Sequence, residues 1–182
     1  MADRSPLHEE KVAFETLLGV ARKGTLWAVL DACDSPDVPE KVEELGSTKA
    51  VSLYRGKGES EFWAIAPYLA SVDEELLTWI KETLWAEPWG FFAEGPSDLE
   101  KLRGHFRKFL TVEDPHGKKM YFRFYDPRVL RTFLRSADEE GLREFFGPVE
   151  RMLVGPEGGG QHGPEGLSAF RVRDLGEGAT GR

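Results

Sequence analysis

The segment 25–33, TLWAVLDAC, is almost entirely apolar over the length of a β-strand. A half-exposed strand alternates apolar and polar residues, whereas a strand covered on both faces is continuously apolar. The segment therefore predicts a central strand with structure packed on both of its faces. Strand-length runs and amphipathic segments alternate along the rest of the chain, which indicates an α/β or α+β fold. We expect a mixed sheet with flanking helices, arranged in one or two lobes.

Turn residues and apolar periodicity place the other expected elements. Further strands are expected at 50–54, 62–72, 89–93, 118–125, 149–154 and 167–175. Pro67 restricts the second of these to a sheet edge or to a strand end, because proline cannot donate to the ladder. Helices are expected over residues 7–23, 40–45, 73–85, 97–110 and 139–146, and a further helix is expected to begin at 126. Asp73 and a capping box at 97–100 mark the starts of two of these helices, and Asp126 with Pro127 marks the start of another.

The 182 residues suit one domain with small appendages. We expect an N-terminal helix within residues 1–24, a main domain over 25–154, and a Gly-rich linker with a flexible tail over 155–182. The first residues, MADRSPLHEEK, lack the apolar core of a secretory signal, and no apolar run is long enough to cross a bilayer. The single cysteine, Cys33, rules out an intrachain disulfide. These features predict a cytoplasmic protein without membrane contact.

The net charge of −8 hides a local asymmetry. Residues 101–135 contain ten Lys or Arg and only three acidic residues, a balance of +7, so the rest of the chain carries −15. Three interpretations stay open for this basic window: solvated helix faces, a docking face for an acidic partner, or a nucleic-acid-binding surface. The overall acidity disfavours the last of these.

Residues that carry common catalytic or metal chemistry are scattered. The four histidines, His8, His105, His116 and His162, have no metal-ligand spacing, and no phosphate-binding glycine loop is present. Cys33 follows an apolar strand, where a small buried hydrophobe is the commoner role. We therefore expect no catalytic site, metal, cofactor or small-molecule substrate, and a binding function. A hydrolase or transferase that unites His105 with an acid or Cys33 is the less favoured alternative.

The segment 122–130, FRFYDPRVL, combines core, charged and capping residues. Alternation predicts that two aromatic residues, Phe122 and Phe124, face the core. Arg123 and Tyr125 would share the opposite face, and Asp126 would cap the next helix. Two roles for Arg123 stay open: an internal ion pair with Asp126 that fixes the corner, or contact with a partner.

Seven short motifs occur in a characteristic order: WAVLDA at 27–32, LYRG at 53–56, APYL at 66–69, WGFF at 89–92, LRGHFRKFL at 102–110, FRFYDPRVL at 122–130 and FFGP at 145–148. In this order they resemble the effector-chaperone or adaptor family of bacterial type VI secretion, the Tap or Tec proteins, a domain long catalogued as of unknown function. The resemblance covers roughly residues 25–154, and FRFYDPRVL is its most specific element. It implies a cytoplasmic, non-enzymatic protein that binds a toxic effector and helps to load it onto the VgrG spike.

The resemblance and the residue types together predict the site. Expected partner-binding residues are His105, Arg107, Arg123, Tyr125, Arg128 and Arg131. Expected structural residues of the motifs are Phe122, Phe124, Asp126, Pro127, Gly147 and Pro148. A groove lined by Trp27, Trp63, Trp85 and Trp89 would shield an apolar client segment, with basic residues at its rim. The alternative function is a nucleic-acid-binding module that uses residues 101–135.

Overall fold

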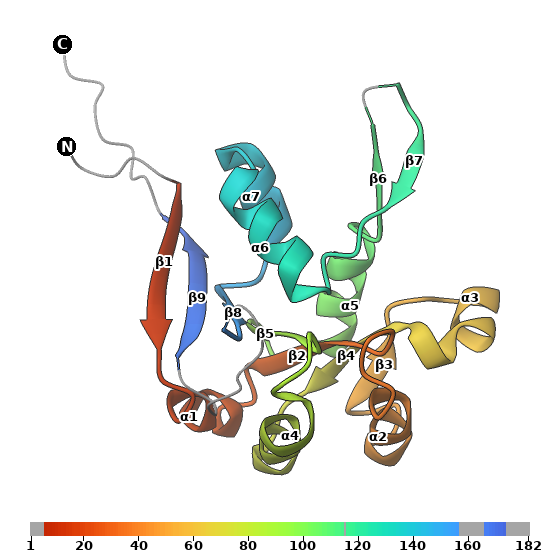
Figure 1. The fold of residues 1–182 in the computed structure, drawn as a ribbon, viewed down its shortest axis with the longest axis vertical. Helices are drawn as coiled ribbons and strands as arrows, with labels where there is room; N and C mark the ends of the chain where they lie inside the picture. Colours follow the sequence, from red (N-terminus) through yellow and green to blue (C-terminus); the bar gives the residue numbers. More distant parts are fainter. Residues whose placement is uncertain (1–5, 115, 157–165, 174–182) are drawn as a thin grey trace.

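The computed structural model describes residues 6–114, 116–156 and 166–173, and seven of its strands form one sheet (Figure 1). The strand order is β1-β9-β8-β5-β2-β4-β3, and every neighbouring pair is antiparallel. The strands are β1 Leu7–Val12, β2 Leu26–Asp31, β3 Ala50–Ser52, β4 Pro67–Ser71, β5 Gly90–Glu94, β8 Arg151–Val154 and β9 Leu167–Val172. A separate hairpin of β6 Thr111–Glu113 and β7 Lys119–Tyr121 projects from the body.

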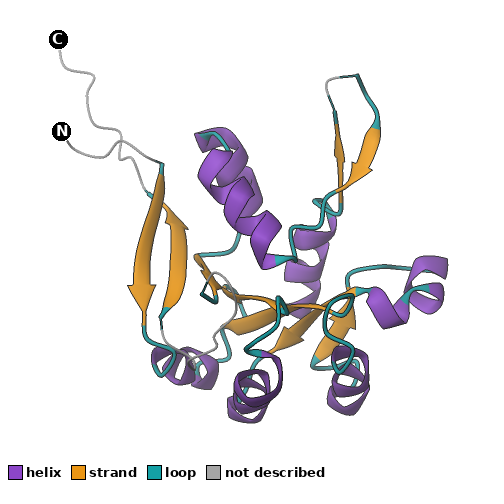
Figure 2. Ribbon diagram, viewed as in Figure 1, coloured by secondary structure: helices purple, strands orange, loops and turns teal. Residues whose placement is uncertain are grey.

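Helices cover both faces of the sheet, which confirms the expected α/β or α+β class with flanking helices (Figure 2). The expected mixed sheet is wrong, because all strand pairs of the described sheet are antiparallel. One face carries α1 Thr16–Arg22, α2 Val38–Leu45 and α4 Glu74–Trp79, which continues into a turn of π-helix, η2 Ile80–Leu84. The other face carries α5 Leu99–Arg107, α6 Pro127–Ser136 and α7 Glu139–Phe146. The short α3 Lys57–Glu61 and the 3₁₀ turn η1 Trp63–Ile65 lie beyond β3. None of the described helices is long and apolar enough to cross a membrane.

Strand β2 is the central strand that its continuous apolarity predicts. All six of its residues are buried, and it pairs with β4 on one side and β5 on the other. Leu26, Ala28 and Leu30 pack into the core beneath α1, α2 and α4, whereas Trp27 and Val29 pack into the core beneath α5, α6 and α7. One strand thus supplies both hydrophobic cores, because successive side chains point to opposite faces.

The expected helix over residues 1–24 is wrong in its first half. Residues 7–12 form β1, which pairs with β9 from Leu7 opposite Val172 to Val12 opposite Leu167. Only Thr16–Arg22 is helical. The segment LHEEKV is short and polar, so its backbone hydrogen bonds to a distant strand decide its conformation rather than local helix propensity.

The expected boundary at residue 155 is also wrong, because the sheet continues beyond it. Strand β9 lies between β1 and β8, and its residues Leu167, Ala169 and Phe170 are buried. The sheet therefore includes β1 and β9, two strands that lie about 155 positions apart in the chain. The remainder of the expected Gly-rich linker and tail, residues 157–165 and 174–182, lies outside the described residues.

Helix caps follow the sequence closely, with one shift. The Asp73 side chain accepts a hydrogen bond from the Leu76 amide, as expected. The cap of α5 is Asp98, which accepts from the Lys101 amide, and not the expected Ser97. The Ser97 hydroxyl donates instead to the Gly24 carbonyl at 2.7 Å. That bond ties the start of α5 to the segment before β2.

The expected strand over 118–125 is shorter in the structure. Only Lys119–Tyr121 is extended in a ladder, and Met120 is exposed rather than buried. The chain then turns, because the Asp126 amide donates to the Arg123 carbonyl. This turn carries Phe124 into the core beneath α5, α6 and α7.

Candidate functional site

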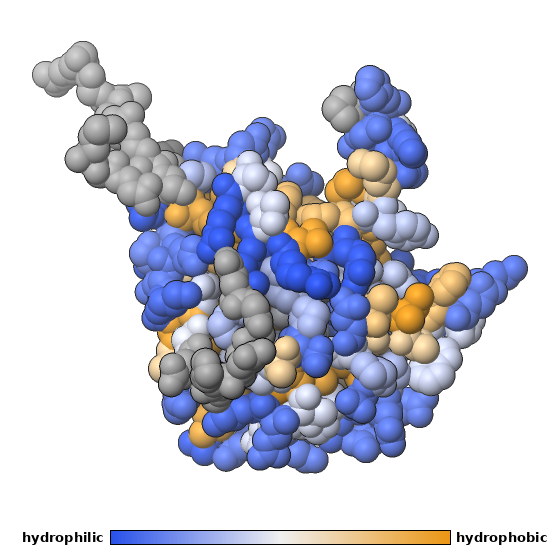
Figure 3. All heavy atoms as spheres, viewed as in Figure 1, coloured by the Kyte–Doolittle hydropathy of each residue, from blue (hydrophilic) through white to orange (hydrophobic). Residues whose placement is uncertain are grey.

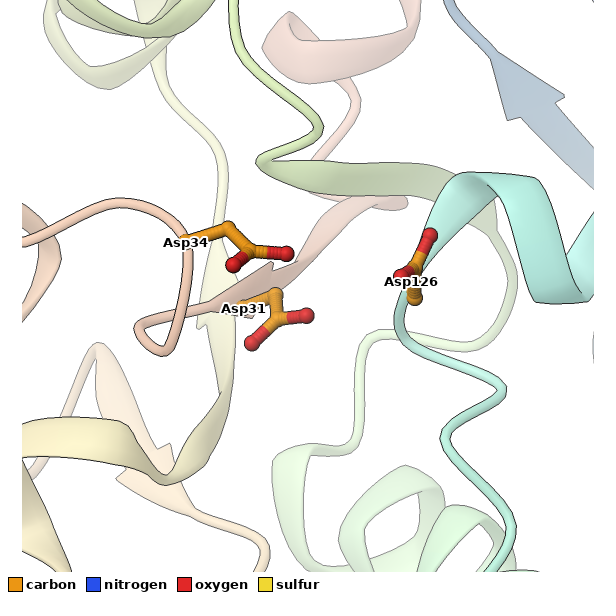
Figure 4. A group of neighbouring side chains, drawn as sticks. All are labelled: Asp31, Asp34 and Asp126. Atoms are coloured by element: carbon orange, nitrogen blue, oxygen red, sulfur yellow. The ribbon is translucent and has the colours of Figure 1, made fainter.

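Carboxylates and guanidinium groups join the end of β2 to the start of α6, and Figure 4 shows the three acids involved. The fully buried Asp31 accepts hydrogen bonds from Arg123 at 2.7 Å and from the Cys33 amide at 3.0 Å. Arg128 bridges the other two carboxylates, with its Nη2 at 2.7 Å from Asp126 and 2.8 Å from Asp34. The expected pair of Arg123 with Asp126 is therefore wrong, and each of the two finds a different partner.

Burial and hydrogen bonding act in opposite directions on these acids. Desolvation raises the pKa of the Asp31 carboxyl, and the hydrogen bond from Arg123 offsets only part of that rise. Desolvation also acts on Asp126, but hydrogen bonds from the Arg128 side chain and amide hold its pKa below the ordinary value. The oxygens of Asp31, Asp34 and Asp126 lie within 4.8 Å of one another, a spacing that could hold a cation. Here the two guanidinium groups supply the positive charge, so the network is a clamp between β2 and α6.

The pH dependence of stability in the variant Asp126→Asn tests this clamp. A carboxyl whose pKa is lowered by folding stabilises the protein above its unfolded pKa, and that stability is lost as pH falls through the folded pKa. Asn keeps an acceptor for the Arg128 amide, but it removes the charge and the second carboxylate oxygen, which accepts from Arg128 Nη2. We expect wild type to be more stable than Asp126→Asn by about 1 kcal/mol near neutral pH, because the partner Arg128 is exposed. The difference should shrink progressively as pH falls below about 4, the ordinary pKa of an aspartate, towards the lower folded pKa of Asp126. Urea unfolding at several pH values measures it, and a constant difference would contradict the clamp.

A cleft of about 490 Å³ opens beside the clamp, between the hairpin and the segment 57–65. We name it the hairpin groove. Its floor comes from the ends of β2, β3 and α5 and from the FRFYDPRVL segment. Its lining residues are Cys33, Tyr54, Arg55, Gly58, Phe62, Ile65, Arg107, Leu110, Tyr121, Arg123 and Tyr125.

The walls of the hairpin groove expose large apolar side chains. Tyr121 of β7 is 81% exposed, and Phe62 and Ile65 on the opposite wall are 49% and 48% exposed. Figure 3 shows apolar surface on both sides of this hollow. The free energy falls when a partner removes such side chains from water. An exposed apolar cleft of this kind is therefore typical of a protein-binding site.

Polar contacts beneath the groove hold its floor in place. Arg103 donates to the carbonyls of Ser52 and Tyr54 and approaches Glu59 at 3.4 Å. The hydroxyl oxygens of Tyr54 and Tyr125 lie 3.4 Å apart, and burial raises the pKa of Tyr125. The groove is therefore a preformed feature of the fold.

Two of the expected partner-binding residues are internal. His105 is buried, its Nε2 lies 2.8 Å from the Phe145 carbonyl oxygen, and burial lowers its pKa. Arg131 is buried on α6, with Nη1 3.5 Å from the Pro127 carbonyl. His105 is therefore part of the core, whereas Arg131, although mostly buried, lines a small cleft beside Trp85 and Trp89. Arg107, Arg123 and Tyr125 do come together, in the lining of the hairpin groove, and the exposed Arg128 lies in the clamp.

The expected structural residues of the motifs hold the fold. Phe124 is fully buried, and the ring of the half-buried Phe122 packs against Phe133 and Phe145. Asp126 caps α6, with Pro127 at its first position. Gly147 ends α7 with φ of 48°, and the half-buried Pro148 follows it.

The expected tryptophan-lined groove is found only in part: Trp85 and Trp89 line a cleft of about 220 Å³, apart from the hairpin groove, together with Arg128 and Arg131. Trp27, Trp85 and Trp89 are buried, and the half-exposed Trp63 is not part of the groove lining. The groove residues that sequence reasoning missed include Phe62, Ile65, Tyr121 and Cys33, the last of which is exposed rather than buried. The sequence signal for the first two is an aromatic residue directly after the polar stretch KGESE, where apolar composition predicts a strand over 62–72.

The basic window balances acids from elsewhere in the chain. Its arginines reach carboxylates outside the window: Arg103 pairs with Glu59, Arg123 with Asp31, Arg128 with Asp34 and Arg135 with Glu9. The local charge of +7 thus reflects complementarity within the fold. This pairing makes a broad nucleic-acid-binding surface less favourable, because phosphates would compete with carboxylates already in place.

Comparison with known proteins places the chain in a family. A family model described as "Domain of unknown function (DUF4123)" matches residues 26–144, from β2 to α7. No curated protein and no solved structure matched the chain. The match includes the clamp and the whole lining of the hairpin groove. Because it spans more than half of the 182 residues, the protein belongs to the DUF4123 family.

Proposed function

We propose that this protein is a non-enzymatic, cytoplasmic adaptor that binds a type VI secretion effector and helps to load it onto the VgrG spike. The family membership and the order of the seven motifs support this role. The observation that carries the proposal is the hairpin groove, a preformed cleft with exposed apolar walls. The client would bury an apolar segment there, and the clamp would hold the groove floor rigid while it does so.

Co-purification tests the role directly. The tagged protein is expressed together with the proteins encoded beside its gene, and we expect it to retain an effector and, through that effector or directly, a VgrG-type spike protein. Retention should survive high salt if apolar burial dominates the contact. If neither an effector nor a spike protein is retained, the adaptor role is wrong.

Two substitutions locate the client on the protein. Tyr121→Ser and Phe62→Ser each remove an exposed apolar side chain from one wall of the hairpin groove. Truncation of a residue at the centre of an interface commonly costs 2 kcal/mol or more, so we expect affinity for the co-purified effector to fall about thirty-fold. Titration calorimetry or biolayer interferometry measures the loss.

Trp63→Ser is the matched control. Trp63 is as exposed as Phe62, at 49%, but does not line the groove. We expect this variant to bind the effector like wild type. Equal losses in all three variants would show that binding depends on general surface hydrophobicity and not on the groove.

Cys33 provides a second readout, because it is the only cysteine and it is exposed in the groove lining. A bulky maleimide attached to Cys33 is expected to block effector binding, whereas small methylthio modification should not. Unchanged binding after complete labelling would place the client elsewhere on the protein.

A further inference from the structure

The charged residues that line the hairpin groove are all of one sign. Arg55, Arg107 and Arg123 contribute to the lining, and no acidic residue does. Two of these arginines already face a carboxylate: Arg123 lies 2.7 Å from Asp31, and Arg55 lies 3.5 Å from Glu100. The third, Arg107, differs from them.

Arg107 is held by the backbone and not by an acid. Its Nη1 donates to the Leu53 carbonyl, and within residues 6–114, 116–156 and 166–173 no carboxylate lies within 4 Å of its guanidinium group. Desolvation and the neighbouring Arg55 and Arg103 lower the pKa of Arg107, with some opposition from Glu59. Arginine nevertheless stays charged in proteins. Among the described residues, the groove therefore presents a half-buried positive charge that no carboxylate contacts directly.

The surroundings of Arg107 define what would neutralise it. Leu110 lies one turn further along the same chain segment, and Phe62, Ile65 and Tyr121 form the exposed apolar walls. A carboxylate that reached the guanidinium group would bring its neighbouring residues against these walls. A guanidinium group matches a carboxylate with two parallel hydrogen bonds, and such charge-assisted bonds are strengthened where water is excluded.

We propose that the hairpin groove binds a segment of a partner polypeptide in which an Asp or Glu side chain lies beside an aromatic or aliphatic residue, with Arg107 as the receptor for the carboxylate. This inference deepens the proposed adaptor function by stating the chemistry of the client segment. It commits to a side-chain carboxylate, since the groove is an open cleft and not a closed pocket for a chain terminus.

A displayed library of random peptides, selected on the intact 182-residue chain, tests the proposal without knowledge of the client. We expect enrichment of peptides that hold Asp or Glu within a few residues of Phe, Tyr, Trp or Leu. The enriched peptides are then synthesised with amidated C-termini, together with their Asp→Asn or Glu→Gln counterparts. Removing the carboxylate should weaken binding to wild type about ten-fold or more, as expected for a lost hydrogen bond between charged groups.

Three variants separate the role of the charge from that of the apolar walls. Arg107→Gln should lose the preference for the acidic peptide over its amide counterpart. Tyr121→Ser should lower the affinity for both peptides alike, and Arg22→Gln, which changes an exposed arginine on α1, should leave both affinities unchanged. Because Arg107 also holds the Leu53 carbonyl, circular dichroism checks the fold of Arg107→Gln, and Arg107→Lys serves as a second variant that keeps the charge. We expect Arg107→Lys to retain part of the preference.

Several results would overturn the proposal. They are selection of basic or uncharged peptides, an acid preference that persists in Arg107→Gln, and peptide binding that Tyr121→Ser leaves unchanged. Tight binding that appears only after removal of residues 174–182 would make the chain's own end the occupant, and would equally overturn it. The test is independent of co-purification: failure to retain neighbouring gene products refutes the secretion role, whereas failure of the peptide selection refutes only the chemistry of the groove.

Discussion

Gly90→Ala is expected to prevent stable folding. Gly90 opens β5 with φ of 134°, a conformation that alanine rarely adopts, and it stands opposite Leu30 of the central strand. A Cβ at this position would lie 1.9 Å from the carbonyl oxygen of Val29, so the two strands could not keep their present separation. Strand β2 supplies both hydrophobic cores, and its displacement would disturb each of them. We expect a loss of more than about 4 kcal/mol, a large part of the stability of a typical domain.

Gly19→Ala is the control for this substitution. Gly19 lies in α1, and a Cβ there would meet nothing within 4 Å. Alanine is the better helix former, so this variant should be more stable than wild type by up to about 1 kcal/mol. Circular dichroism and urea unfolding compare the two variants. A cooperatively folded Gly90→Ala with near wild-type stability would show that β2 and β5 approach each other less closely than the structure has them.

Phe124→Ala is expected to destabilise the protein by about 3–5 kcal/mol. The Phe124 ring is fully buried and stacks on Phe106, with centroids 5.7 Å apart and an interplanar angle of 18°. Its edge contacts reach Phe91 and Phe145, so removing it leaves a cavity between the sheet, α5 and α7. The unfolding midpoint in urea measures the loss.

Two comparisons separate the cavity from other effects of this change. Phe124→Leu refills much of the space and should lose distinctly less stability than alanine. Phe122→Ala should also lose less, because Phe122 is only half-buried at the edge of the same aromatic cluster. An equal loss in all three variants would mean that the segment acts through its backbone and not through ring packing.

Much of the central architecture was predictable from local pattern. The apolar run 25–33 indicated a strand covered on both faces, and the structure confirms it. Caps at Asp73 and Asp126 follow from the preference of short acids for the first orphan amides of a helix. These features depend on residues that are close together in the chain, which a sequence pattern reports well.

The errors arose where distant residues decide the outcome. Local pattern predicts a helix that includes 7–12, whereas the distant strand at 167–172 decides its conformation. For Arg123 the nearby Asp126 is one of two candidate partners, whereas its partner in the structure is Asp31, 92 positions away. The groove was partly predictable in composition: Arg107, Arg123 and Tyr125 were named, whereas Cys33 and the apolar walls were not. An apolar side chain stays exposed when no other part of the fold packs over it, and a local sequence pattern does not contain that information.

The pairing of β1 with β9 has a consequence for the order in which this protein can fold. Strand β1 is made first, yet its partner is synthesised only after nearly the whole domain: the Lys11 ammonium group donates to the Ser168 hydroxyl, 157 positions further along. Until β9 is made, β1 lacks its neighbour in the sheet, and β8, once it is made, has one uncovered edge. A nascent chain therefore holds β1 without its partner strand while residues 13–166 are synthesised, and an unpaired strand is the state in which chains associate with one another or recruit folding helpers.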